Sequence, residues 1–240
     1  MQKPFRGGNR PMSEPAVRGR RAAVLRSVWL VVAALLAAAA PVLAAECVSI
    51  EDFAKAKLGE FPPDWTVRQE EGRGVYSVGE QLGVRFLRAV SRGLGIQAAK
   101  SHEWSLTTHP VLAWSWRLHA FPSGADERES KTNDSALAVY AVFPHSPMSV
   151  KSVKYIWSER VPRGTHLTSS RGLTQVRVAR NGPERKGEWV EERVNVLADY
   201  RRFFEETGVP KPAGIAVLTD ADDTKSVAQG DYANFRVCPP

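Results

Sequence analysis

The sequence predicts a mainly β protein, folded as a sandwich or barrel with a single helix among the strands. Three observations support this fold class. Short segments in which apolar and polar residues alternate recur along the chain. Turn residues, chiefly glycine and proline, separate them. One segment near residue 200 instead repeats its apolar residues at helical spacing. No repeat or Gly/Ser linker divides residues 46–240, so one domain is expected there.

Nine segments have the pattern of a β-strand. Within Leu112–Leu118 the large apolar residues occupy alternate positions, while Ala113, Ser115 and Arg117 face the other way. The segment 136–143 is apolar on both faces, which is typical of a strand covered on both sides. The predicted strands are Gly74–Val78, Val84–Val90, Leu112–His119, Ala136–Phe143, Val153–Ser158, Thr174–Ala179, Glu188–Val194, Gly214–Thr219 and Tyr232–Val237.

One amphipathic helix is predicted between two of these strands. Asn195 is a suitable N-cap, and Asp199 lies near the positive end of the helix dipole. Gly208 followed by Pro210 is a typical stop. The apolar face of this helix is expected to pack on a sheet as the chain crosses over. A second, shorter helix is predicted over Ile50–Lys57.

Residues 1–45 have the organisation of a signal peptide. A basic stretch ends at Arg26, an uncharged apolar run covers Val28–Ala40, and small residues follow Pro41. This order of basic region, apolar core and cleavage site directs export. The mature protein is therefore expected to be periplasmic or secreted, with no membrane span after cleavage. An uncleaved anchor is the alternative, because Val28–Ala45 approaches the shortest length that crosses a bilayer.

The charge of the mature part gives no reason to expect a polyanionic partner. The whole chain has 33 Lys and Arg against 26 Asp and Glu, a formal net charge of +7. Residues 1–45 hold seven of the basic residues and one acid, which leaves 26 basic and 25 acidic residues in the remainder. A nearly neutral domain argues against nucleic acid as a partner.

The two cysteines, Cys47 and Cys238, lie at opposite ends of the mature chain. Cysteines of exported proteins commonly pair, and the two ends of one domain are often close together. A disulfide between the first and last segments is therefore predicted. Two free thiols or a redox pair are the alternatives, and the lack of a Cys-x-x-Cys motif argues against the redox pair.

Several phrases of the mature chain form a recognisable set. They are Phe53 with Gly59–Trp65, Pro110–Trp116, Asn133-Asp134 before Val139–Phe143, Tyr155–Trp157, Asn195–Tyr200, Thr219–Thr224 and Gly230–Tyr232. Read together and in this order, they resemble a bacterial family known as domain of unknown function number 3047. The chain departs from that family's pattern at Asn133, where a second acid is usual, and at Ala221, where a polar residue is usual.

The resemblance implies a fold but no catalytic residues, because the family has no established activity. Its pattern is also similar to jelly-roll domains of the carbohydrate-binding kind. That similarity implies an all-β, two-sheet antiparallel, jelly-roll-like β-sandwich with one crossover helix. It is an analogy at the level of the fold and supports a function only weakly.

The aromatic residues of the predicted strands are the first candidate ligand site. Exposed tryptophans on a sheet can stack on the apolar face of a sugar ring. Trp114 and Trp116 would share one strand face about 7 Å apart, and Tyr155 and Trp157 form a similar pair. All four are candidate saccharide contacts, and Asp134 is a polar candidate contact. The alternative is that the rings fill the core between the sheets.

A run of acids, Asp220, Asp222 and Asp223, follows a predicted strand and is the second candidate site. Closely spaced carboxylates bind hard cations such as calcium. The run is no EF-hand, because Lys225 stands at the position of the central glycine and Asp231 at that of the final glutamate. The alternative is a solvated turn in which aspartates cap backbone amides. Calcium is thus a candidate ligand, and no cofactor is required.

The motifs of common enzyme classes are missing from the sequence. There is no Gly-x-Ser-x-Gly, no His-Glu-x-x-His and no phosphate loop. The predicted function is therefore non-enzymatic binding of a saccharide-like or other polar ligand, such as a polysaccharide or another envelope component. A glycoside hydrolase or lyase acting on envelope polysaccharide is one alternative, and it would need two acids in a cleft. A structural envelope protein that binds other proteins is another, and it would show an exposed apolar patch.

Overall fold

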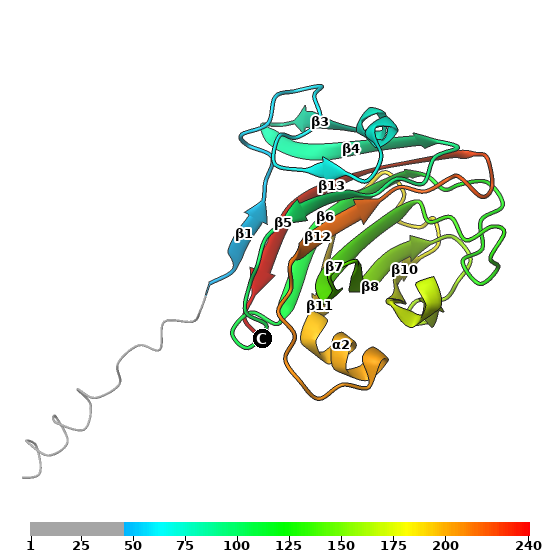
Figure 1. Cartoon of the computed structure of the whole chain (residues 1–240). Helices are drawn as coiled ribbons and strands as arrows, with labels where there is room; N and C mark the ends of the chain where they lie inside the picture. Colours follow the sequence, from blue (N-terminus) through cyan, green and yellow to red (C-terminus); the bar gives the residue numbers. More distant parts are fainter. Residues whose placement is uncertain (1–45) are drawn as a thin grey trace, which may run out of the picture. The chain divides into compact units, whose positions relative to one another are not determined.

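Alternation along the strands gives the protein two sheets that pack face to face, as the computed structural model shows for residues 46–240 (Figure 1). These residues belong to one compact unit. The predicted signal peptide, residues 1–45, and its alternative as an anchor lie outside the described residues. Among the described residues, the helices are too short or too polar to cross a membrane.

The first sheet, here called sheet A, has six strands. Its order is β11-β6-β13-β4-β3, and β1 pairs with the end of β13. The strands are β1 (Val48–Glu51), β3 (Tyr76–Gln81), β4 (Val84–Arg92), β6 (Val111–Ala120), β11 (Val190–Asn195) and β13 (Val227–Cys238).

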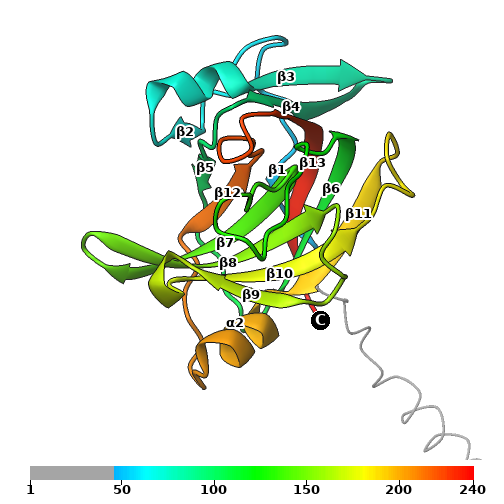
Figure 2. The ribbon, with the colours of Figure 1, turned by 90° about the vertical axis from the view of Figure 1, so that its right-hand side faces the viewer.

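The second sheet, sheet B, has seven strands in the order β2-β5-β12-β7-β8-β10-β9. Figure 2 shows β7, β8, β10 and β9 side by side in it. Its strands are β2 (Thr66–Val67), β5 (Ala98–Ser101), β7 (Leu137–Ser146), β8 (Ser149–Ser158), β9 (His166–Ser169), β10 (Thr174–Asn181) and β12 (Gly214–Leu218). The two-sheet sandwich is thus confirmed. The pairing of β8 with β10 is parallel, whereas the other described pairings are antiparallel.

Sheet B is apolar on both faces, as the double apolar pattern of residues 136–143 predicts. Its inner face joins the main core between the sheets through residues such as Val139 and Val153. Its outer face carries a second apolar cluster. That cluster consists of Ala138, Tyr140, Ile156, Val161, Val176, Val178, Ala216 and Leu218. Side chains on this outer face therefore have partly dehydrated surroundings.

Buried hydrogen bonds connect the two sheets where β12 ends. The hydroxyl of Tyr232, on β13, donates to the carbonyl oxygen of Leu218 at 2.8 Å and lies 2.9 Å from the hydroxyl of Thr219. The Tyr232 hydroxyl oxygen also accepts the backbone N–H of Ala138 at 3.2 Å. These buried bonds fix the start of the loop that carries Asp220.

The predicted disulfide is confirmed, since Cys47 and Cys238 are bonded across a sequence separation of 191 residues. It lies beside the pairing of Val48 with Val237, where β1 adds to the end of β13. The helix predicted over Ile50–Lys57 is wrong. The start of this segment is strand β1, held by backbone bonds to β13, and turns follow it.

The main helix is confirmed as α2 (Val196–Phe204). The Asn195 side chain accepts the N–H of Ala198 at 2.9 Å, as predicted for the N-cap. The helix ends earlier than predicted, because Glu205 turns into the left-handed region at φ 55° before Gly208 is reached. Figure 1 shows α2 in the connection from β11 to β12, at one end of the sandwich.

Candidate functional site

The aromatic site predicted from the sequence lies inside the core. Trp114, Trp116, Tyr155 and Trp157 are all 0% exposed. Trp114 packs edge-to-face on Trp116 at 5.2 Å between ring centroids, and each also contacts a ring of β8 at 5.7 Å. The predicted role in stacking on a saccharide is therefore wrong. Large rings on the facing sides of β6 and β8 remove more apolar surface from water between the sheets than outside them.

Asp134 also differs from its prediction as a saccharide contact. It is 0% exposed, and its carboxylate accepts the backbone N–H groups of Asp223 at 3.1 Å and Thr224 at 2.8 Å. The hydroxyl of Thr224 donates to it as well, at 2.5 Å. Asp134 therefore anchors the loop between β12 and β13 and does not face a ligand of saccharide size.

Three carboxylates converge at this loop, although they are not the three that the sequence run suggests. One oxygen each of Asp134, Asp220 and Asp222 lies within 4.8 Å of the others. Asp223 is exposed and instead accepts a hydrogen bond from the amide of Asn133 at 2.9 Å. Of the predicted metal ligands, Asp220 and Asp222 therefore converge and Asp223 does not, and the third carboxylate is that of Asp134, in the connection from β6 to β7.

Asp220 is the most perturbed of these acids. Only 7% of the residue is exposed, and its Oδ1 has no hydrogen-bond partner within residues 46–240. Burial raises the pKa of Asp220 to about 8, with Lys154 opposing the rise and Asp222 and Asp134 adding to it. A Cβ added at Gly95 would collide with Oδ1 of both Asp220 and Asp222. Glycine at this position therefore makes room for the two carboxylates.

The outer face of sheet B is hollowed beside these acids. A cavity of about 500 Å³ is lined by Ser152 and Thr174, and one of about 290 Å³ is lined by Lys154 and Val176. These are consecutive outward-facing positions of β8 and β10, and Thr174 pairs with Ser152 as Val176 pairs with Lys154. The two cavities thus adjoin, and together they are called the outer groove. Its lining also includes Gln69, Gly95, Gln97, Arg128, Asn133 and Thr168.

Charged side chains lie at the floor of the outer groove. Lys154 is 8% exposed, and its ammonium lies 5.8 Å from the ring centroid of Tyr140. Burial lowers the pKa of Lys154, but Tyr140, Asp220 and Glu127 outweigh this, so the net pKa lies above its ordinary value. Burial raises the pKa of Glu127, although the Ser158 hydroxyl, which donates to it at 2.5 Å, opposes the rise. Lys154 is therefore a buried cation with acidic neighbours from two loops.

Ser135 is the second unusual polar group of the outer groove. It lines the smaller cavity and is 0% exposed. In the described part of the chain, its hydroxyl has no hydrogen-bond partner. A buried hydroxyl without a partner is destabilising by about 1–3 kcal/mol. Such a group is expected to form a hydrogen bond either with a water molecule or with a bound ligand.

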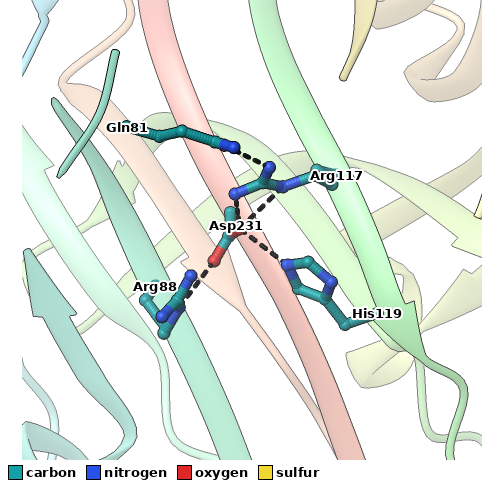
Figure 3. Close-up of polar contacts among 5 residues, drawn as sticks. All are labelled: Gln81, Arg88, Arg117, His119 and Asp231. Carbon is teal, nitrogen blue, oxygen red and sulfur yellow. Dashed lines mark hydrogen bonds and ion pairs between the residues drawn. The ribbon is translucent and has the colours of Figure 1, made fainter. Parts of the chain in front are cut away.

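A polar cluster on the outer face of sheet A has a different character (Figure 3). Asp231 is fully buried, and Arg117 donates to its Oδ2 through Nε at 2.9 Å and Nη2 at 2.6 Å. His119 lies 2.7 Å from the same oxygen, and Arg88 donates to Oδ1 at 3.2 Å. Gln81 accepts from Arg117 at 2.6 Å. Every oxygen of Asp231 is thus paired, as expected of a structural network.

The pKa of Asp231 reflects this network. Burial raises the pKa, but hydrogen bonds from His119 and Arg117 outweigh burial, and the net pKa lies below its ordinary value. The Arg117 guanidinium also lies 4.6 Å from the ring centroid of Trp189. Trp189 is the one partly exposed tryptophan among the six of the described residues.

Sequence reasoning missed Lys154, Glu127 and Ser135. Lys154 did leave a signal, because it is a charged residue inside the predicted strand Val153–Ser158, whose other residues are mostly apolar. Such a lysine needs either a solvent-facing side or a buried partner. Glu127 and Ser135 lie in the connection from β6 to β7, where no periodicity assigns a face.

Comparison with solved structures gives several distant similarities. The carbohydrate-binding module TmCBM61, solved with β-1,4-galactotriose, is 13% identical over 81% of this chain and 99% of its own, with a TM-score of 0.38. The family 11 xylanase from Neocallimastix patriciarum is 12% identical over 77% and 99%, with a TM-score of 0.37. The xyloglucanase domain of NopAA, a type three effector from Sinorhizobium fredii, is 10% identical over 73% and 98%, also with 0.37.

These identities and TM-scores are too low to transfer a site or an activity. The comparison with curated proteins finds no match. A family model, described as "Protein of unknown function (DUF3047)", matches residues 63–236, which include every strand of both sheets except β1 and the end of β13, and the acids of the β12–β13 loop. The resemblance expected from the sequence phrases is therefore confirmed, and the chain belongs to the DUF3047 family.

Proposed function

We propose that the protein binds a saccharide-like, polar ligand in the outer groove of sheet B. The observation that carries this proposal is the buried hydroxyl of Ser135, which lines the groove without a partner among residues 46–240. A bound hydroxyl group would supply the missing hydrogen bond. Lys154 lines the same cavity, and its ammonium, which lies near Asp220 and Glu127, is a charged donor for such a ligand.

The size and lining of the groove fit a ligand of a few sugar units. Cavities of about 500 Å³ and about 290 Å³ fall in the range of small-molecule sites. Apolar side chains such as Val176, Leu167 and Leu218 alternate with hydroxyl and amide groups in the lining. A sugar presents the same mixture, with C–H faces and hydroxyl edges. Among residues 46–240 no tryptophan lines the groove, so binding would rest on hydrogen bonds and is expected to be weak.

The experiment compares Ser135→Ala with Ser101→Ala, a control at the exposed end of β5. Binding of a panel of plant and envelope oligosaccharides is measured by isothermal titration calorimetry. Ser135→Ala is expected to leave the free protein at least as stable as the parent, and up to about 1–3 kcal/mol more stable, because it removes a buried hydroxyl that has no partner. The same change should weaken binding about 3–10-fold, the equivalent of one neutral hydrogen bond, whereas Ser101→Ala should not.

A second variant, Lys154→Met, keeps the aliphatic stem and removes the ammonium. It is expected to weaken binding by about 10–100-fold, since a charge-assisted hydrogen bond is lost. Unfolding is followed in parallel, because the variant leaves Asp220 and Glu127 without their cation. If no oligosaccharide binds, or if both groove variants bind as tightly as the parent, the proposal is wrong.

The hydrolase and the protein-binding alternatives stay open as outcomes of the same experiment. Glu127 and Asp220 both lie near Lys154 and have raised pKa values. Release of reducing ends during the titration would therefore identify a hydrolase. The most exposed large apolar residues, Leu82 and Met148, lie in separate hairpins, so a single apolar patch for a protein partner has less support.

A further inference from the structure

Three connections meet at the end of the sandwich where β12 stops. The β12–β13 loop supplies Asp220 and Asp222, the β6–β7 connection supplies Asp134, and the β4–β5 connection supplies Gly95. One oxygen from each acid lies within 4.8 Å of the others. Backbone bonds join the same three connections, since the N–H of Asp220 donates to Ser135 and the N–H of Ala221 donates to Leu94.

Asp220 distinguishes this site from an ordinary cluster of acids, because it is buried and one of its oxygens is unpaired. It is 93% buried, because 7% of the residue is exposed, and its Oδ1 has no donor anywhere in residues 46–240. That oxygen points into the cluster, since both it and Oδ1 of Asp222 face the space over Gly95. A buried carboxylate oxygen without a hydrogen bond is strongly disfavoured unless the carboxyl takes up a proton or coordinates a cation.

The other oxygens of the cluster are already held in place. Asp134 accepts hydrogen bonds from Asp223 and Thr224, which fix the direction of its carboxylate. The N–H and the hydroxyl of Thr224 both donate to Oδ2 of Asp134, whereas Oδ1 accepts only the N–H of Asp223. Because each oxygen can accept two hydrogen bonds, one lone pair of Oδ1 remains for an ion. Asp222 is exposed, so an ion could enter from solvent without any part of the core opening. Hydrogen-bonded ligands with one open side are the arrangement expected around a bound metal.

The excess negative charge of the three carboxylates also favours binding of a cation. Three carboxylates lie together, and the cation that acts on Asp220 is Lys154 on the outer face of sheet B. With only one ammonium nearby, the three acids cannot all be ionised in a poorly solvated site unless a further cation binds, because their mutual repulsion there exceeds its value in water. Lys225 acts on Asp223, which lies outside the cluster.

We infer that Asp134, Asp220 and Asp222 bind one calcium ion, which ties together the β4–β5, β6–β7 and β12–β13 connections. Calcium suits this site better than magnesium, because calcium accepts irregular sets of oxygen ligands, whereas magnesium requires a near-ideal octahedron and retains its waters. The affinity of extracellular calcium modules, about 10⁻⁴–10⁻³ M, sets the expected range. This inference does not depend on the proposed saccharide binding.

The test uses the full-length protein, exported and purified, treated with a chelator and then dialysed. Thermal unfolding is recorded at rising calcium concentration and constant ionic strength, with magnesium and sodium as comparison ions. Calcium at ten times its dissociation constant is expected to raise the Tm by about 3–6 °C. Equilibrium dialysis should show about one calcium ion per chain in the same concentration range.

The decisive variant is Asp222→Asn, and its matched control is Asp223→Asn. Both residues are exposed acids of one loop, but only Asp222 contributes to the cluster. The Asp222→Asn variant should keep its fold and lose both the shift in Tm and the bound calcium, while Asp223→Asn keeps them. The inference is overturned if the parent shows neither effect up to about 10 mM calcium, or if the two variants behave alike.

Discussion

The buried ion network around Asp231 permits a prediction of stability that the structure constrains closely. Replacing Asp231 by Asn keeps the shape of the side chain but removes the charge that Arg117 and Arg88 share. The Arg117 side chain is only 10% exposed, so water cannot replace the lost partner. Removing one member of a buried ion pair is destabilising by about 3–5 kcal/mol. A domain of this size should then lose roughly 6–20 °C in Tm.

The pH dependence of the same variant follows from the lowered pKa of Asp231. A carboxyl whose pKa is lower in the folded state than in the unfolded chain stabilises the fold above the unfolded value, near 3.9. That stabilisation is lost as the pH falls through the folded pKa. The groups that face Asp231 are Arg88 on β4 and Arg117 and His119 on β6. The difference between the parent and Asp231→Asn should therefore shrink below about pH 4.

Urea unfolding followed by fluorescence, at neutral pH and again at acidic pH, measures both effects. Asp126→Asn is the control, because Asp126 pairs with Arg128, whose side chain is 52% exposed. Surface pairs of this kind contribute about 1 kcal/mol or less. The reasoning is refuted if Asp231→Asn changes the free energy of unfolding no more than this control does, or if the difference persists unchanged in acid.

Two further predictions concern the ends of the chain and the acid cluster. Replacing Cys47 and Cys238 by serine removes a cross-link that closes 191 residues, and the chain-entropy model gives an upper limit of about 5 kcal/mol for the loss, measurable as a lower urea midpoint. A parent protein whose urea midpoint is insensitive to reducing agent would contradict this. Gly95→Ala places a methyl group against the carboxylates of Asp220 and Asp222. It should destabilise the protein by about 1–3 kcal/mol and abolish the calcium-dependent rise in Tm, whereas Gly74→Ala, which meets no atom within 4 Å, should leave that rise intact.

The strands of the sandwich were largely predictable because period two is a local signal. All nine predicted segments overlap observed strands, and the segment Gly74–Val78 fails only at its start, where a short 3-10 helix covers Glu70–Val75. The strands that the pattern missed are β1, β2, β5 and β9, each of four residues or fewer. Segments this short hold too few alternations to reveal a period. Their strand conformation depends on neighbours that lie far away in the sequence.

The candidate site was less predictable because it depends on which residues meet in space. The pattern placed Trp114 and Trp116 on one face of a strand, which is correct, but it could not tell the inner face from the outer one. The acids of the β12–β13 loop were recognised as a run, yet Asp134 joins them from 86 positions away. The pairing of β7 with β12, strands that lie far apart in the sequence, brings these two loops together. The prediction of the disulfide was correct because two cysteines, one at each end of the mature chain, allow only one intramolecular pairing.

The outer faces of the two sheets differ in their unpaired polar groups, and this difference favours a ligand site on sheet B. The unpaired indole N–H groups of Trp114 and Trp116, on β6 of sheet A, lie in the core between the sheets. On sheet A, Asp231 uses both of its oxygens, and Arg117 is held by Asp231 and Gln81. A ligand there would have to displace bonds that are already made. On sheet B, the unpaired hydroxyl of Ser135 lines the outer groove, and the unpaired Oδ1 of Asp220 lies beside Gly95, which is also part of its lining. New bonds to these oxygens would replace none. A protein that retains buried oxygens without partners is less stable for it, and a ligand or an ion that pairs them recovers that stability as binding energy.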